Sequence, residues 1–96
     1  MNEQEMFQRS KDKWGLASQI NILAEESAEL AVVALHMNRT RKQGAECWES
    51  FAEEIADVQF MIAEMKDYFP ILQAKVNLYR SMKSARLQKL LEENKE

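Results

Sequence analysis

Residues 16–37 read LASQINILAEESAELAVVALHM, and this stretch decides the fold. Its apolar residues recur at intervals of three and four, which is the spacing of one face of an α-helix. The predicted core-facing stripe consists of Leu16, Ile20, Leu23, Ser27, Leu30, Ala34 and Met37. The same helix carries an acidic cluster, Glu25-Glu26-Ser27-Ala28-Glu29, along the side of that stripe.

A loop and a second helix are predicted after this first helix. Residues 38–44, NRTRKQG, have no apolar side chain and include a glycine, which predicts a loop. A second helix is predicted over residues 46–69, ended by Pro70 because proline lacks an N–H and restricts the residue before it. Its stripe consists of Trp48, Phe51, Ile55, Val58, Ile62, Met65 and Phe69.

Two further segments complete the predicted architecture. A third long helix is predicted over residues 71–91, with apolar residues recurring along it. Residues 3–12 form either a short helix or an ordered arm, and Trp14-Gly15 marks a corner after it. The predicted fold class is therefore all-α: a helical hairpin plus a third long helix.

Composition sets limits on the fold, the partners and the compartment. The chain has 96 residues, which predicts one domain over residues 1–96, and its two glycines and one proline favour helix. So short a chain has a thin core, which predicts an oligomer. A net charge of −3 gives no reason to expect a nucleic-acid partner. No apolar run approaches the ~20 residues of a membrane span. A single cysteine, Cys47, suits a reducing cytoplasm.

The acids of both predicted helices lie on the same flank of their stripes. At about 100° per residue from the centre of the stripe, Glu26 falls near −80° and Glu29 near −140°. On the second helix, measured in the same way from the centre of its stripe, Glu54 falls at about −60° and Asp57 at about −120°. In an antiparallel hairpin the heights also match, because both cross-helix pairs share a midpoint inside the loop. Glu25 points outward.

This arrangement predicts a metal site. Four carboxylates at close range repel one another, and partial burial makes their ionisation costlier. A divalent cation offsets both effects, and oxygen-only ligands favour Mg²⁺ or Mn²⁺. The alternative is that these acids are solvated surface, as most glutamates on helices are.

The remaining candidate residues have charged, imidazole or aromatic side chains. On the third helix, Lys83 and Arg86 fall inside an apolar arc. They are either partners in salt bridges or solvent-reaching side chains, or they form a cationic clamp for phosphates. His36 follows the first acidic cluster on the same flank, and a lone histidine excludes a ferritin-like di-iron centre with its paired Glu-x-x-His motifs. Trp14 and Trp48 are predicted to pack in the core, and the alternative is that they stack on a nucleotide base.

The ordered acidic motifs resemble those of the all-α nucleoside triphosphate pyrophosphohydrolases, the MazG-like superfamily. The pattern EExxE, a spacer and ExxD stands here as Glu25-Glu26-Ser27-Ala28-Glu29 and Glu54-Ile55-Ala56-Asp57. The flanking positions that resemble the family are Trp14-Gly15, Gln19, Leu30, Val58 and Lys83-Ser84-Ala85-Arg86-Leu87. The likeness covers residues 14–90 and is greatest to short, single-domain, phage-type members.

The resemblance implies Mg²⁺-dependent hydrolysis of a nucleoside triphosphate to the monophosphate and pyrophosphate. It implies that Glu26, Glu29, Glu54 and Asp57 bind the metal, and that the protein is a homodimer or homotetramer with the site near an interface. We expect Glu25 or Glu29 to orient or deprotonate the attacking water.

The substrate contacts follow from the same expectation. We expect Lys83 and Arg86 to bind the β and γ phosphates, and the base to lie towards His36 or an aromatic side chain. Two alternatives stay open: a phosphoribosyl-ATP pyrophosphohydrolase, with the same chemistry on another substrate, and a non-catalytic helical interaction module.

Overall fold

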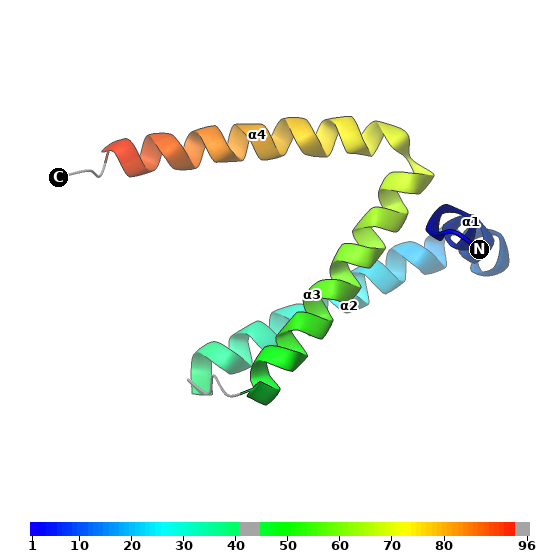
Figure 1. The fold of residues 1–96 in the computed structure, drawn as a ribbon, viewed down its shortest axis with the longest axis horizontal. Helices are drawn as coiled ribbons and strands as arrows, with labels where there is room; N and C mark the ends of the chain where they lie inside the picture. The colour runs from blue at the N-terminus through cyan, green and yellow to red at the C-terminus, as the bar shows by residue number, and fades with distance from the viewer. Residues whose placement is uncertain (41–44, 94–96) are drawn as a thin grey trace.

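The computed structural model describes residues 1–40 and 45–93, and all the secondary structure in these ranges is α-helical (Figure 1). The helices are α1 (Glu3–Trp14), α2 (Leu16–Thr40), α3 (Ala45–Tyr68) and α4 (Pro70–Glu93). The predicted all-α fold class is therefore confirmed. None of these helices has the length and apolar character that crossing a membrane requires.

Helix α1 begins and ends with the caps that its sequence encodes. The side chain of Asn2 accepts a hydrogen bond of 2.8 Å from the backbone N–H of Glu5, which satisfies one of the free donors of the first turn. At the other end the Gly15 N–H donates to the carbonyl of Lys11 at 2.8 Å. Gly15 has φ of 86°, a conformation that favours glycine, so the predicted corner at this position is confirmed.

Contacts with the end of α3 hold α1 in place. Phe7 is buried and packs edge-on against Phe60, with ring centroids 5.2 Å apart. The Tyr68 hydroxyl donates to the Phe7 carbonyl at 2.8 Å, and the Gln8 amide donates to Asp67 at 3.1 Å. Segments far apart in sequence are thus joined at one end of the molecule.

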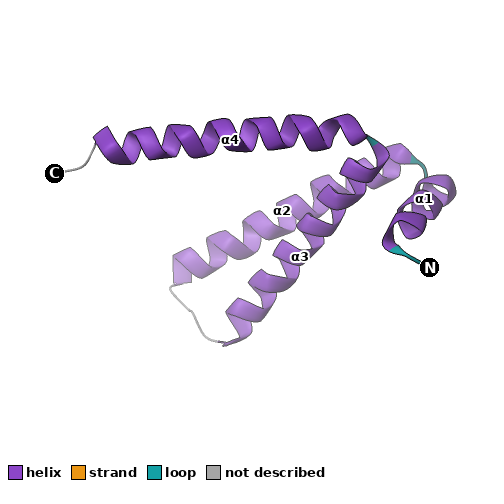
Figure 2. Ribbon diagram, turned by 45° about the horizontal axis from the view of Figure 1, so that its top comes forward, coloured by secondary structure: helices purple, strands orange, loops and turns teal. Residues whose placement is uncertain are grey.

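Helices α2 and α3 form the predicted antiparallel hairpin (Figure 2). Helix α2 continues through Thr40, so the prediction that the loop begins at residue 38 is wrong. Residues 41–44 of the predicted loop lie outside the described residues. Helix α3 ends at Tyr68, and Pro70 becomes the first residue of α4, where a missing N–H costs nothing.

Both hairpin helices are rotated relative to the predicted stripes. On α2, Gln19 is 3% exposed, whereas Ile20 is 46% exposed and Ser27 is also exposed. On α3, Trp48 and Ile62 are exposed although the stripe placed them inside. The buried face of each helix is turned by roughly 60° towards its acids. The physical reason is that polar residues share the helix interface, which a stripe drawn through apolar residues alone does not include.

Helix α4 extends away from the hairpin (Figures 1 and 2). Among the described residues it contacts only α3, and only Leu72 and Val76 in its first two turns are half-buried. Its large apolar side chains are exposed: Leu78, Tyr79, Met82, Leu87, Leu90 and Leu91. The prediction that Trp14 packs in the core is also wrong, since this side chain is 57% exposed.

Candidate metal centre

Three of the four predicted metal ligands come together between α2 and α3. Glu26 and Glu29 lie one turn apart on α2, and Glu54 faces them from α3. Each offers a carboxylate oxygen, and these oxygens all lie within 4.8 Å of one another. The matching heights of the two acidic motifs, predicted from the sequence, produce this cluster.

Glu26 is the acid most affected by its surroundings. Burial raises its pKa, and the charges of Glu29 and Asp57 raise it further, from the ordinary value of 4.5 to about 7. Its Oε2 atom is shielded from solvent and has no hydrogen-bond partner among the described residues. A shielded oxygen without a donor is costly in the free protein and is suited to coordinate a cation.

Glu54 shows the same pattern from the opposite helix. Burial raises its pKa, and the charges of Glu29 and Asp57 add to the rise. Its Oε2 atom is likewise shielded and without a partner in the described chain. Asp57, the fourth predicted ligand, is exposed and lies outside the group of three oxygens, yet its charge acts on both Glu26 and Glu54.

The spacing of the oxygens fits a hard divalent cation. Mg²⁺ binds oxygen at about 2.0–2.1 Å, so opposite ligands lie roughly 4 Å apart. Oxygens within 4.8 Å of one another therefore need only small movements to coordinate one ion. Carboxylates alone select Mg²⁺ or Mn²⁺ over softer metals. The residues present thus fit the predicted cofactor.

The other predicted site residues lie outside this cluster. Glu25 is exposed, as its outward angle predicted, and His36 is exposed further along α2. Lys83 and Arg86 are exposed on α4, which does not contact α2 within the described residues. The structure therefore brings together the acids but not the acids and the two cations of the same chain.

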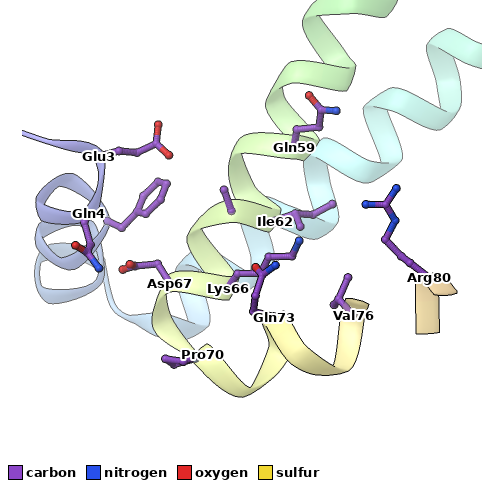
Figure 3. A pocket seen from close by; sticks show the side chains of 12 residues that line it. Glu3, Gln4, Gln59, Ile62, Lys66, Asp67, Pro70, Gln73, Val76 and Arg80 are labelled. Carbon is purple, nitrogen blue, oxygen red and sulfur yellow. The ribbon is translucent and has the colours of Figure 1, made fainter. Parts of the chain in front are cut away.

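A large hollow among the described residues is separate from the acids. It has a volume of about 1080 Å³ and lies between α1, α3 and the first turns of α4 (Figure 3). Lys66 and Arg80 line it together with Ile62, Gln73 and Val76, and none of the predicted metal ligands does. We assign the candidate site to the acidic cluster, because none of the described residues that line the hollow has a shielded side-chain oxygen or nitrogen without a partner.

Two buried polar residues escaped the sequence prediction. Gln19 is 3% exposed and Glu64 is 2% exposed, and each has one side-chain atom without a partner among the described residues, Nε2 and Oε2 respectively. A signal for them was present, since Gln19 precedes Glu26 by seven residues and Glu64 follows Asp57 by seven. Seven residues are two helical turns, so each lies on the face of its acid.

No protein-family model, curated protein or solved structure matches the chain.

Proposed function

We propose that this protein hydrolyses a nucleoside triphosphate to the nucleoside monophosphate and pyrophosphate in a Mg²⁺- or Mn²⁺-dependent reaction. The observation that supports the proposal is the cluster of Glu26, Glu29 and Glu54, whose oxygens lie within 4.8 Å of one another. Two of these carboxylates hold shielded oxygens that receive no hydrogen bond from the described part of the chain. The MazG-like order of the motifs supports the same activity.

Each residue of the site has a proposed role. Glu26, Glu29, Glu54 and Asp57 hold the cation, which supplies positive charge to the triphosphate oxygens and makes a water more acidic. Glu25 or Glu29 orients that water towards the α-phosphorus or accepts its proton. Lys83 and Arg86 bind the departing pyrophosphate, and His36 lies towards the base.

The cations of α4 reach the acids only if a second copy provides them, so the proposal includes a homodimer or homotetramer. Surface area supports this assembly. The chain exposes 7870 Å², whereas a folded monomer of its mass exposes about 5,700 Å². Its radius of gyration is 17.1 Å, against about 12–13 Å for a compact domain of its length. An excess of roughly 2,200 Å² per chain is what an obligate dimer buries.

A turnover screen tests the activity. The purified protein is incubated with standard and modified ribo- and deoxynucleoside triphosphates, with and without Mg²⁺, and pyrophosphate release is measured. We expect release that requires the metal and is lost in Glu26→Gln and Glu54→Gln. Glu49→Gln, an exposed acid on α3 outside the cluster, is the matched control and retains activity.

The same screen separates the alternatives. Phosphoribosyl-ATP joins the panel, and turnover of it alone identifies the related pyrophosphohydrolase. Absence of turnover on every substrate, together with no response of the melting temperature to Mg²⁺, would identify a helical interaction module.

A further inference from the structure

A buried carboxyl, a hydroxyl and a backbone carbonyl meet where α1 contacts the end of α3. Glu64 is 2% exposed, and its side chain lies in hydrogen-bonding contact with the Tyr68 hydroxyl, one turn further along α3. The same hydroxyl donates to the Phe7 carbonyl of α1 at 2.8 Å. These three groups therefore form a hydrogen-bonded chain that joins the buried face of α3 to α1.

The number of protons in this chain decides which of its bonds can form. A tyrosine hydroxyl has one proton to donate, and a backbone carbonyl has none. While Tyr68 donates to Phe7, the Glu64 carboxyl can bond to the same hydroxyl only by donating a proton of its own. An ionised Glu64 has no such proton and competes with Phe7 for the proton of Tyr68.

The surroundings of Glu64 favour its neutral form. Burial raises the pKa of Glu64, and the hydrogen bond with Tyr68, which is stronger to a carboxylate, opposes part of this rise. The Oε2 atom of Glu64 is shielded and has no hydrogen-bond partner in the described part of the chain, so a negative charge there is poorly compensated. Burial also raises the pKa of Tyr68, and the charge of Glu64 adds to that rise, so Tyr68 keeps its proton.

We propose that Glu64, Tyr68 and the Phe7 carbonyl form a proton-controlled latch on α1. While Glu64 holds a proton, it donates to Tyr68, and Tyr68 donates to Phe7 and holds α1 against α3. When Glu64 gives its proton to water, Tyr68 donates to the carboxylate instead, and the Phe7 carbonyl loses its bond to α3.

Two differences in bonding set the direction of this switch. A hydroxyl bonds more strongly to a carboxylate than to a neutral carbonyl, because the carboxylate carries a full charge. Phe7 lies inside α1, where its carbonyl can also accept the bond of its own helix, so it is not left unsatisfied when Tyr68 turns away. Ionisation of Glu64 therefore weakens the attachment of α1 without disrupting the helix itself.

The other charged groups around the latch act on Tyr68. Asp67 and Asp12 raise the pKa of Tyr68 through their charges, and the Lys11 Nζ lies 5.2 Å from the centroid of the Tyr68 ring. Among the described residues, Tyr68 is the titratable group that acts on the pKa of Glu64. A variant in which Glu64 alone cannot ionise keeps all these other groups, so its comparison with the wild type isolates the latch.

Release of α1 changes the hollow between α1, α3 and α4. Glu3 and Gln4 of α1 line this hollow together with Lys66 of α3 and Arg80 of α4 (Figure 3). The protonation state of Glu64 therefore controls whether the hollow keeps the wall that α1 provides.

Infrared spectroscopy of the metal-free protein tests the protonation of Glu64. The C=O stretch of a protonated carboxyl is separate from the bands of carboxylates. We expect a protonated-carboxyl band to remain after ordinary glutamates have ionised. Glu64→Gln should remove a part of this band that Glu26→Gln leaves in place.

Hydrogen exchange with mass spectrometry tests the attachment of α1. The protection factor of residues 3–14 compares the measured exchange rate with that of the unfolded peptide at the same pH, which removes the direct effect of pH. The Phe7 bond belongs to the protonated form of Glu64, so it is present at low pH and is lost as pH rises through the raised pKa of Glu64, above its ordinary value of 4.5. We expect the protection of α1 in the wild type to fall roughly five-fold relative to Glu64→Gln over this rise.

Three variants make the result decisive. Glu64→Gln retains a side chain that donates to Tyr68 and cannot ionise, so α1 should stay protected. Tyr68→Phe cannot bond to Phe7, so the protection of α1 should be low at every pH. Glu49→Gln, an exposed acid on α3, is the matched control and should keep the wild-type profile.

Equal pH profiles in the wild type and Glu64→Gln would overturn the proposal, and so would an infrared band that Glu64→Gln leaves unchanged. If Glu64→Gln fails to fold, Tyr68→Phe decides: a Tyr68→Phe protein with the wild-type protection of α1 and the wild-type pH profile would overturn the latch.

Discussion

Glu26 in α2 and Glu54 in α3 place carboxylate oxygens within 4.8 Å of each other. Both oxygens designated Oε2 are shielded from solvent, and burial together with the charges of Glu29 and Asp57 raises the pKa of both residues. Two shielded carboxylates this close repel each other unless a cation or a proton neutralises them. This repulsion determines how the stability of the protein responds to metal, to pH and to substitution.

Mg²⁺ or Mn²⁺ at millimolar concentration should raise the melting temperature, because an ion that binds only the folded state stabilises it by mass action. At a hundred times the dissociation constant the gain is about 2.7 kcal/mol. Glu26→Gln, Glu54→Gln and Asp57→Asn should abolish the rise, and Glu49→Gln should keep it. Thermal unfolding by circular dichroism measures the effect. A wild type that does not respond to either ion would contradict the metal site.

The metal-free protein should lose stability as pH rises from 4.5 to about 7. Glu26 has a folded pKa of about 7 and an ordinary value of 4.5, so the folded state holds more protons within this range. Its contribution is complete below pH 4.5 and disappears as pH rises through 7. Melting curves in the presence of a chelator check this. Glu26→Gln should flatten the slope, and an equal slope in that variant would assign the effect to other groups.

Tyr68→Phe should loosen α1 from the end of α3. The substitution removes the hydroxyl that donates to the Phe7 carbonyl at 2.8 Å and that also lies in hydrogen-bonding contact with the buried Glu64 carboxyl, so at least about 1 kcal/mol of folding free energy should be lost. For a domain of this size that loss lowers the melting temperature by roughly 4–8 °C. Ser50→Ala, which removes a hydroxyl from an exposed position of α3, is the control. Equal melting temperatures in both variants would refute the role of the bond.

The wild type should be at least a dimer at micromolar concentration, and its interface should include the outer half of α4. Tyr79→Glu/Met82→Glu should shift it towards the monomer, because two charges replace apolar surface that the interface buries. Ser84→Glu, which adds a charge at an exposed polar position of the same helix, should keep the assembly. Multi-angle light scattering gives the mass, and a monomeric wild type would defeat this prediction.

Arg86→Ala separates a phosphate clamp from a scaffold role. Arg86 is exposed in the chain, so its loss should leave the melting temperature and Mg²⁺ affinity nearly unchanged. Loss of one charged contact to the leaving pyrophosphate should lower kcat/KM roughly 30- to 1,000-fold, which is about 2–4 kcal/mol of transition-state stabilisation. The melting temperature, the Mg²⁺ affinity and kcat/KM are all measured on one folded preparation. If the Arg86→Ala variant keeps wild-type turnover but melts at a lower temperature, Arg86 stabilises the fold and does not bind phosphate.

The sequence by itself determined the helices and the heights of the acids. The apolar periodicity, Gly15 and Pro70 act over a few residues, so their effects can be predicted from local backbone geometry. The equal spacing of the two acidic motifs from the loop predicted which acids meet, because residues rise along a helix by a constant step.

Only the tertiary structure decided which way each helix is turned and what lies against α4. The rotation depends on all neighbours at once: Gln19 and Glu64 are inside, while Ile20 and Trp48 are exposed. A stripe drawn through apolar residues cannot predict this, because it leaves out the polar side chains that the packing of α2 against α3 places inside. The same holds for helix α4: its apolar periodicity predicts that it is a helix, but does not predict which surface packs against it.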